Sequence, residues 1–217
     1  MAAGPRFRSD YIIFYPSLAC QTCKTVKLPR SKHCTICERC IPLHDHHCIW
    51  INNCVGYGNY EFFYSFLLSN CVLLTYASVR LLTLFSVTFK KDKFFLSLFL
   101  LTAAFSLMAN VFTYYQLRLV NEGMTNNEQD KWYVVQEYMR NGNLVKDQNG
   151  SLYFKSTGDC IPPEDQVYYS TNLYDHAKHR LTDPVRIHNH EDITNIYDKG
   201  NFWDNMRERL HLFGRIN

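Results

Sequence analysis

The stretch "CTICERCIPLHDHHCIWINNC", residues 34–54, holds five cysteines and three histidines in 21 positions. Thiols and imidazoles at this density are typical of metal sites. Metal ligands alone do not explain the run from Asp45 to Cys48, in which a carboxylate, two histidines and a cysteine are adjacent. The stretch therefore raises the question of whether one cysteine is kept free for chemistry.

The cysteine pattern extends upstream to Cys20 and reads C-x2-C-x9-H-C-x2-C-x2-C-x4-D-H-H-C-x5-C. The Cys-x2-Cys spacing lets two thiolates reach one tetrahedral ion, which favours zinc, and the interleaved histidines argue against an iron–sulfur cluster. Two sites of three cysteines and one histidine would use six of the seven cysteines and two of the four histidines. One cysteine remains, but counting does not identify it, and it leaves other ligand sets open.

The residues around Cys48 offer the parts of an activated nucleophile. A nucleophilic cysteine needs a nearby base, and a histidine oriented by a carboxylate is a suitable one. Asp45, His46 and Cys48 supply all three within four positions. The alternative is that Asp45 and His46 only support neighbouring zinc ligands.

Composition narrows the class of protein. The chain has 217 residues, a net charge of +3 and nine cysteines, most of them mixed with histidines rather than spread as a disulfide framework. This usage indicates a reducing compartment. The mild charge, with no concentrated basic face, argues against nucleic acid as a partner.

Two long uncharged runs follow the cysteine-rich stretch, at 62–79 and 94–117. A bilayer core needs about 20 apolar residues per helix, so we expect two membrane helices rather than two buried helices of a soluble core. The expected fold is a membrane α-helical one, with a zinc-bound cysteine-rich domain, a transmembrane helical hairpin and a small mixed C-terminal region. The expected boundaries are 1–19 for an N-terminal segment, 20–61 for the cysteine-rich domain, 62–84 and 94–118 for the helices, 85–93 for their connection, and 119–217 for the C-terminal region.

Two signals in the sequence predict opposite orientations in the membrane. The connection carries Arg80, Lys90, Lys91 and Lys93, which by the positive-inside rule would lie in the cytosol. The cysteines instead place the opposite side there, because thiolate ligands need reducing conditions. We give the cysteines more weight, so the cysteine-rich domain and the C-terminus are expected to be cytosolic.

The C-terminal region contains local signals for three elements. Thr125 and Glu128 form a capping box at the start of a helix over 125–140. The dipeptide Asn149–Gly150 predicts a hairpin turn, and "IPPEDQ" (161–166) predicts a loop. A helical stripe near the end either rests on the membrane surface or packs on its own domain; it consists of Trp203, Met206, Leu210 and Phe213, flanked by Arg207, Arg209 and Arg215.

The cluster, continued to Asn59 and Phe63, resembles the cysteine-rich domain of the DHHC family of protein S-acyltransferases, or palmitoyltransferases. After the second membrane helix the family carries a Thr-Thr-x-Glu motif, which here reads Thr125-Asn126-Asn127-Glu128. In the family the second threonine helps to hold the catalytic aspartate, and Asn126 replaces it. A C-terminal family motif has its best matches at Tyr197 and Asn205. "NEGMTNNEQDKWY" and "IYDKG" are similar to the fungal endoplasmic-reticulum branch that acylates SNAREs.

The resemblance implies roles for individual residues. Cys48 would be the acylated nucleophile, His46 its general base and Asp45 the group that orients His46. One structural zinc ion would be held by Cys20, Cys23, His33 and Cys40, and a second by Cys34, Cys37, His47 and Cys54.

The resemblance also implies acyl-CoA, specifically palmitoyl-CoA, as co-substrate. Phe62, Phe63 and Phe66 begin the first span and would line an apolar cavity for the acyl chain. We group Thr125, Asn126 and Glu128 with these residues around the co-substrate. A basic surface is either solvated charge or a contact for CoA phosphates or lipid headgroups; it comprises Lys24, Lys27, Arg30, Lys32 and Arg39.

The implied partners are palmitoyl-CoA, the lipid bilayer and membrane proteins with juxtamembrane cysteines, SNAREs among them. The expected location is the endoplasmic-reticulum membrane. The family usually places two membrane helices before its cysteine-rich domain, so we expect two upstream helices to be missing from this chain. The competing interpretation is a catalytically incompetent zinc module that docks partners at the membrane.

Overall fold

The computed structural model describes residues 7–87, 93–156, 166–172, 175–189 and 192–210. The chain forms two compact units, one of Met1–Tyr57 with Gly123–Lys199 and one of Gly58–Glu122 with Gly200–Asn217. Chain segments that are distant in sequence therefore share each unit.

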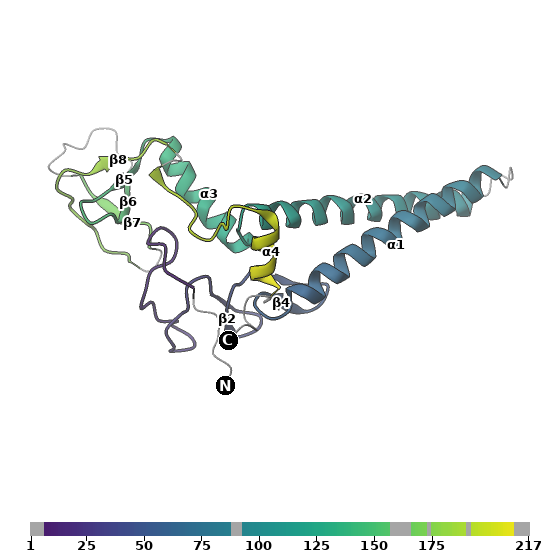
Figure 1. The fold of residues 1–217 in the computed structure, drawn as a ribbon, viewed down its shortest axis with the longest axis horizontal. Helices are drawn as coiled ribbons and strands as arrows, with labels where there is room; N and C mark the ends of the chain where they lie inside the picture. The colour runs from purple at the N-terminus through teal and green to yellow at the C-terminus, as the bar shows by residue number, and fades with distance from the viewer. Residues whose placement is uncertain (1–6, 88–92, 157–165, 173–174, 190–191, 211–217) are drawn as a thin grey trace. The chain divides into compact units, whose positions relative to one another are not determined.

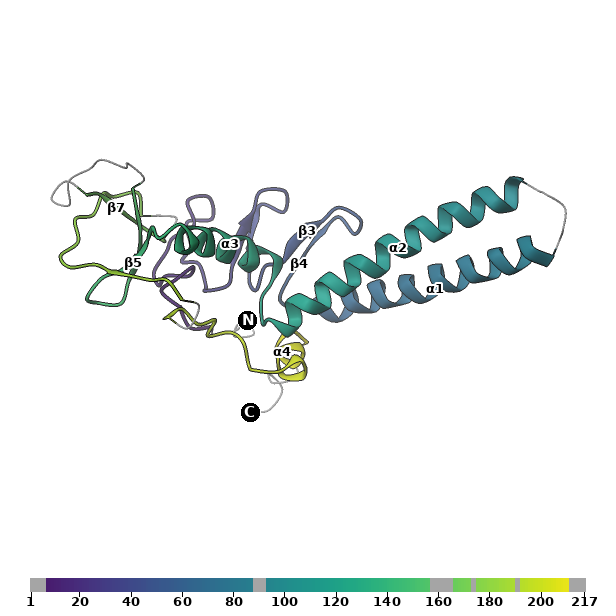
Figure 2. The same ribbon diagram turned by 90° about the horizontal axis from the view of Figure 1, so that it is seen from above.

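The cysteine-rich stretch of the first unit folds as two short antiparallel hairpins (Figure 2). β1 (Lys32–Cys34) pairs with β2 (Arg39–Ile41), and β3 (His46–Cys48) pairs with β4 (Asn53–Val55). Each strand has three residues, and one cluster of buried residues here consists of Cys34, Ile41 and Cys54 with Cys37 against it. Hairpins this short bury little surface of their own, which is the situation in which small domains use metal.

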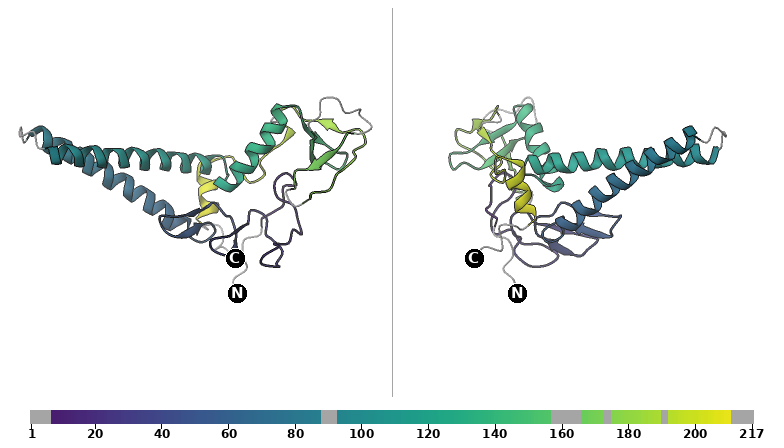
Figure 3. Two further views of the ribbon diagram at one scale, coloured as in Figure 1. Left: turned by 180° about the vertical axis from the view of Figure 1, so that it is seen from behind. Right: turned by 45° about the vertical axis from the view of Figure 1, so that its right-hand side comes forward.

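The remainder of the first unit is a helix followed by a small sheet (Figure 3). α3 (Asn126–Arg140) begins with the predicted capping box, which is confirmed, and leads into β5 (Leu144–Lys146). β5 pairs with β6 (Leu152–Lys155) in the hairpin predicted around Asn149–Gly150. The edges are β7 (Tyr168–Ser170) beside β6 and β8 (Val185–Arg186) beside β5, so the antiparallel order is β7-β6-β5-β8.

The main core of the first unit lies between α3 and this sheet. α3 contributes Trp132, Val135 and Met139, one helical face spaced three and four residues apart. Two buried residues of the N-terminal segment, Ile13 and Phe14, pack in the same core, together with Leu144, Leu152, Ile187, Ile193 and Tyr197. Ile13 and Phe14, which the sequence marks only as part of a short apolar run, thus belong to the same core as the C-terminal region.

The second unit consists of α1 (Tyr60–Val87), α2 (Lys93–Asn121) and α4 (Phe202–Arg209). α1 and α2 lie side by side as a hairpin (Figure 1) and are long enough to cross a bilayer, since a helix rises 1.5 Å per residue. Their most apolar windows have a mean hydropathy of 1.5 and 2.0, and only 28% and 6% of those windows is buried. A core helix of a soluble protein would be mostly buried, so this exposed apolar surface favours lipid as its surroundings.

Polar side chains lie on the faces that α1 and α2 turn to each other. Thr75 Oγ1 lies 3.0 Å from Ser106 Oγ, and Asn110 donates to Thr75 Oγ1 at 3.2 Å and to the Ser106 carbonyl at 2.8 Å. Asn110 therefore contacts protein, as expected of a polar residue in a span. Asn70, a polar residue in the middle of α1, donates to the carbonyl of Phe66 one turn earlier in the same helix.

α4 corrects the expected basic flank of the C-terminal stripe. Arg209 is buried rather than exposed, and it donates to the Tyr64 hydroxyl at 2.9 Å and to the Leu119 carbonyl at 3.0 Å. Trp203 is 69% exposed, while Asn205 is buried and donates to the Asn121 carbonyl. Parts of three expectations lie outside the described residues: Phe213 and Arg215, the loop at 161–165, and the connection at 88–92.

Gly123 gives a test of how tightly the first unit closes. Its φ of +64° suits glycine, and a Cβ there would lie 2.6 Å from the Asp198 Cα. Gly142 has a similar φ of +69° with no atom within 4 Å of such a Cβ. Gly142→Ala should cost about 1 kcal/mol through backbone strain, and Gly123→Ala about 1–3 kcal/mol more through overpacking. Denaturant unfolding of the zinc-loaded protein measures both, and equal losses would contradict the packing at Gly123.

Candidate metal centres and reactive cysteine

Two groups of four side chains place their ligand atoms within 4.8 Å of one another. The first is Cys20, Cys23, His33 and Cys40, and the second is Cys34, Cys37, His47 and Cys54. Among the closer pairs, Cys23 Sγ lies 3.2 Å and Cys40 Sγ 3.9 Å from His33 Nδ1, and Cys37 Sγ lies 3.6 Å from Cys54 Sγ. Tetrahedral zinc with ordinary bond lengths has ligand–ligand edges of about 3.5–3.8 Å, so both groups fit a zinc ion.

The two Cys-x2-Cys turns have the same local geometry. The Cys23 amide donates to Cys20 Sγ at 3.4 Å, and the Cys37 amide donates to Cys34 Sγ at 3.4 Å. In each turn the residue after the second cysteine has a positive φ, +55° at Lys24 and +52° at Glu38. Amide donors aimed at a sulfur stabilise its thiolate form, which is the form that binds metal.

The hairpin registers explain the remaining ligands. His33 lies opposite Cys40 across β1 and β2, and His47 lies opposite Cys54 across β3 and β4. Each hairpin thus delivers a histidine and a cysteine to one cluster. Successive residues of a strand point to opposite faces. His33 and the adjacent Cys34 therefore belong to different clusters, and Cys34 lies in the cluster of the second hairpin.

The same alternation separates the residues of β3. His47 points to the second metal cluster, so His46 and Cys48, two residues apart, share the other face. Cys48 is buried, at 7% exposure, and lies outside both clusters. The adjacent histidines therefore occupy different environments, and the cysteine left over by ligand counting stands beside one of them.

His46 bridges a carboxylate and this cysteine. Its Nδ1 lies 2.6 Å from Asp45 Oδ2, and its side chain is 24% exposed while that of Asp45 is fully buried. Burial lowers the pKa of His46, but hydrogen bonds to Asp45 and Cys48 and their charges raise it, and the net shift is upward. Both effects of the carboxylate favour a proton on the ring.

Asp45 is held in turn by the start of α3. The Asn126 amide donates to Asp45 Oδ1 at 3.0 Å, and the Asn126 side chain donates to Oδ2 at 3.1 Å. Asn126 is the first residue of α3, after the N-cap Thr125, so the carboxylate also faces the positive end of the helix dipole. The asparagine that replaces the family's threonine thus makes the contact through both its backbone and its side chain.

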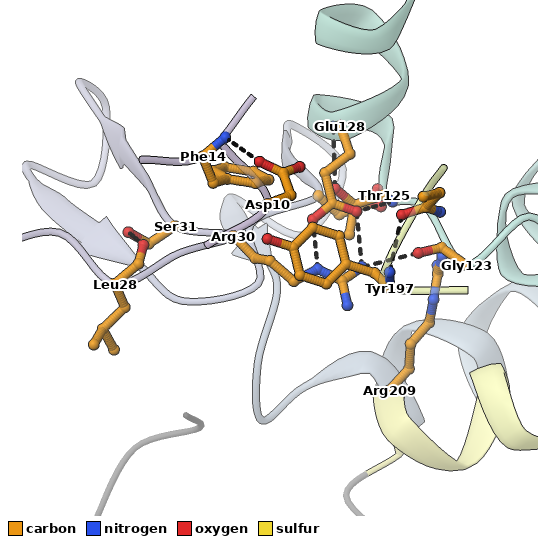
Figure 4. A network of polar contacts seen from close by, with 12 residues as sticks. Asp10, Phe14, Leu28, Arg30, Ser31, Gly123, Thr125, Glu128, Tyr197 and Arg209 are labelled. Atoms are coloured by element: carbon orange, nitrogen blue, oxygen red, sulfur yellow. Dashed lines mark hydrogen bonds and ion pairs between the residues drawn. The ribbon is translucent and has the colours of Figure 1, made fainter. Parts of the chain in front are cut away.

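A buried ion pair fixes α3 to the cysteine-rich stretch (Figure 4). Arg30 Nε and Nη2 donate to the two carboxylate oxygens of Glu128 at 2.6 and 2.7 Å, and Nη2 also donates to the Gly123 carbonyl at 3.0 Å. The guanidinium carbon lies 4.4 Å from the centroid of the Tyr197 ring, a cation–π contact. Assigning Arg30 to an exposed basic surface was therefore wrong, because its side chain is only 2% exposed.

The residues expected around the co-substrate have separate environments. Thr125 and Glu128 are buried in the capping box, and Glu128 is also buried in the ion pair with Arg30. Phe62 and Phe66 are exposed on α1, at 68% and 44%, whereas Phe63 is buried and stacks edge-on with Phe112. Only the first two present open apolar surface.

Sequence reasoning missed the central place of Arg30 and Gly123. Arg30 follows a proline in a run of lysines and arginines, which reads as solvated charge. Its partner Glu128 is 98 residues away. The one available signal was Glu128 itself, which the capping box had already explained.

Two Cys/His clusters next to an Asp-His-Cys group that lies outside them define a zinc-binding domain with a thiol site. A family model described as DHHC palmitoyltransferase matches residues 13–133. The chain is 73% identical over 213 residues to palmitoyltransferase SWF1 of Kluyveromyces lactis, covering 98% of this chain and 66% of the relative. It is 48% identical over 211 residues to palmitoyltransferase SWF1 of Saccharomyces cerevisiae, covering 93% and 63%.

The chain belongs to the DHHC palmitoyltransferase family, which confirms the resemblance seen in the sequence. It spans less than two thirds of the length of these relatives. The family and the two long apolar helices together make it an integral membrane protein, and the expected fold class is confirmed.

Zinc analysis tests the ligand sets. Cys34→Ser should lower the zinc content and the stability together, because binding a structural zinc ion contributes about 10–16 kcal/mol to folding in small metal domains. Cys48→Ser should keep the wild-type zinc content of two ions per chain, since Cys48 lies outside both clusters. Cys71→Ser, in α1, is the matched control. Zinc loss in Cys48→Ser would make Cys48 a ligand and contradict the assignment.

Proposed function

We propose that this chain carries the catalytic centre of a protein S-palmitoyltransferase. It moves a long-chain acyl group from acyl-CoA, through an acyl-cysteine intermediate at Cys48, to cysteines of membrane proteins. The observation that carries the proposal is the chain of contacts from Asp45 through His46 to Cys48, with a 2.6 Å distance between the first two side chains. That is the arrangement of an activated nucleophile with an oriented base.

The first step is acylation of the enzyme. With Nδ1 of His46 bound to Asp45, Nε2 takes the proton of the Cys48 thiol. The thiolate attacks the thioester carbonyl of acyl-CoA, the bond from the carbonyl to the CoA sulfur breaks, and CoA leaves with the proton from His46. Cys48 now holds the acyl group in a new thioester.

The second step transfers the acyl group from Cys48 to the substrate by the same chemistry. His46 takes the proton of a substrate cysteine, whose thiolate attacks the carbonyl of acyl-Cys48. The Cys48 sulfur leaves and recovers the proton. One thioester replaces another in each step, so the transfer needs no ATP.

The zinc ligands and Asn126 would position Asp45, His46 and Cys48. Six cysteines, with His33 and His47, would hold two structural zinc ions that brace the hairpins, and Asn126 holds Asp45. We retain the expected domain boundaries, in which the residues of these roles, apart from Asn126, lie in a cysteine-rich domain at 20–61.

The surroundings of Cys48 suit an interfacial reaction. The turn after β3 exposes Ile49 and Trp50, at 74% and 76%, and a tryptophan next to an aliphatic residue favours the membrane–water interface. In the second unit, Phe62 and Phe66 are exposed apolar residues of α1. Palmitoyl-CoA is the proposed donor, since each buried CH₂ contributes about 0.8 kcal/mol to binding.

We infer a cytosolic cysteine-rich domain and C-terminus in the endoplasmic-reticulum membrane, with SNAREs among the substrates. Support for the orientation comes from the eight clustered ligands, whose thiolates need a reducing compartment. The location and the substrate class rest on the similarity of "NEGMTNNEQDKWY" and "IYDKG" to the fungal branch noted above.

Acyl-enzyme formation tests the proposal directly. The zinc-loaded chain in detergent micelles should take a clickable palmitate group from its CoA thioester, and neutral hydroxylamine should remove it. Cys48→Ser should abolish the label because the nucleophile is gone, and Cys71→Ser should keep it. A label that survives Cys48→Ser contradicts the assignment of the nucleophile. A wild-type chain that binds two zinc ions and takes no label would support the docking-module interpretation instead.

Asn126 gives a second test that separates positioning from chemistry. Asn126→Ala removes the side-chain donor to Asp45 and keeps the backbone donor. A hydrogen bond to a charged group contributes about 1.5–3 kcal/mol, so acyl-enzyme formation should slow at least about tenfold, with little change in the KM for acyl-CoA. Asn126→Thr restores a donor and should recover most of the rate. Equal rates in all three proteins would show that the side-chain contact does not matter.

A further inference from the structure

The first unit contains a pocket of about 340 Å³ that the proposed chemistry does not use. Its walls come from the N-terminal segment, the loop before β1, α3 and the edge of the sheet. The volume is at the lower end of the range for ligand sites. The three triad residues and all eight clustered ligands lie outside its lining.

The walls of the pocket are held by short-range contacts. Asp10 Oδ1 accepts from the amides of Ile12, Ile13 and Phe14, which fixes the N-terminal segment as a tight loop. On the other side, the Tyr15 hydroxyl lies 2.5 Å from Thr171 Oγ1, next to β7. A pocket with such fixed walls is preorganised, so a ligand does not have to order them.

The lining combines apolar surface with positive charge. Ile13, Phe14 and Val135 belong to the core, and Leu28 and Val134, each 42% exposed, extend the apolar surface to the mouth. The charged side chains of the lining are Lys27, Lys32 and Lys131 against one acid, Asp130.

Lys131 shows that these cations lie close together. Its Nζ lies 4.1 Å from the centroid of the Phe14 ring. Its pKa is lowered to about 8, chiefly by burial; the charges of Lys32 and Lys27 also lower the pKa, and those of Glu128 and Asp10 oppose the shift. The ammonium group is still mostly protonated at neutral pH, so an anion in the pocket would meet three positive charges and the single negative charge of Asp130.

One polar group on the wall lacks a partner within the described part of the chain. Asn127 lines the pocket and is 4% exposed, and its Nδ2 is a buried donor without an acceptor there. An unsatisfied buried donor costs about 1–3 kcal/mol, so an acceptor supplied by a ligand would be favourable. A carbonyl oxygen is such an acceptor.

We propose that this pocket is a docking site for a peptide segment of a protein partner that carries acidic residues next to an apolar side chain. The apolar side chain would occupy the floor, the carboxylates would face the three lysines, and a backbone carbonyl would accept from Asn127. A phospholipid headgroup supplies negative charge and acceptor oxygens, but it has no apolar side chain to cover Ile13 and Val135. If the proposed acyl transfer holds, the pocket selects protein substrates, and that role rests on the proposed function.

Fluorescence anisotropy with a labelled peptide tests the site without any acyl transfer. The probe is GSDLFEGS, with GSKLFKGS and GSDSSEGS as controls that reverse its charge or remove its apolar residues. The full zinc-loaded chain carrying Cys48→Ser should bind the probe and neither control. Lys27→Glu should weaken binding about tenfold, because reversing a charge replaces attraction by repulsion. Val134→Trp, which adds no charge, should weaken it similarly by filling the mouth.

The matched control is Lys178→Glu, the same charge change at an exposed lysine of the first unit outside the pocket lining. It should leave binding unchanged. Equal binding of GSKLFKGS, or loss of binding in Lys178→Glu as large as in Lys27→Glu, would overturn the proposal. So would displacement of the probe by vesicles of phosphatidylserine and phosphatidylcholine or by CoA, since either would assign the pocket to another ligand. Peptide binding in a chain that forms no acyl-enzyme would retain the docking site and reject the catalytic function.

Discussion

Arg30 is the residue on which the geometry of the candidate site depends. Its side chain binds Glu128 and the Gly123 carbonyl, and its own carbonyl accepts from the His44 amide at 3.0 Å. One residue therefore joins the start of α3 to the position just before Asp45. The contact from Asn126 to Asp45 lies between these two attachments. A buried pair of this kind adds little net stability, but removing one partner strands a charge and typically costs 3–5 kcal/mol. It specifies an arrangement more than it stabilises the fold.

The first unit is ordered by three different means, each suited to a segment that lacks the others. The cysteine-rich stretch has strands of only three residues and has eight ligands placed for two metal ions. The helix and sheet have a conventional core around Trp132 and Leu144. The ion pair of Arg30 and Glu128 joins these two parts. Because the rings of Tyr197 and Phe7 lie within 4.4 and 5.2 Å of the guanidinium carbon, the charge is screened from water without losing favourable contacts.

The features that the sequence predicted are those encoded by local spacing. The Cys-x2-Cys turns, the capping box of Thr125 and Glu128, the hairpin at Asn149–Gly150 and the two long apolar helices each depend on residues a few positions apart. The features it could not predict join distant segments. Ile13 and Phe14 look like a short apolar run, and no residue near them in the sequence indicates which core they belong to. Arg30 reads as surface charge for the same reason. Cys48 was predicted only in part. Counting ligands showed that one cysteine was spare, and strand alternation in the structure places Cys48 on the face opposite His47.

The replacement at Asn126 shows how much of the Asp45 contact is set by the backbone. The capping box fixes Thr125 at the N-cap, so residue 126 must be the first of the helix with its amide free to donate. That amide binds Oδ1 whatever the side chain is, and the helix dipole adds its attraction for the same carboxylate. The side chain supplies only the second donor, to Oδ2. Any short side chain with a donor in that place satisfies the carboxylate, so an amide can stand where relatives of the family have a hydroxyl. The stricter requirement falls on Glu128, which must both close the capping box and neutralise Arg30, and no neutral residue can do both.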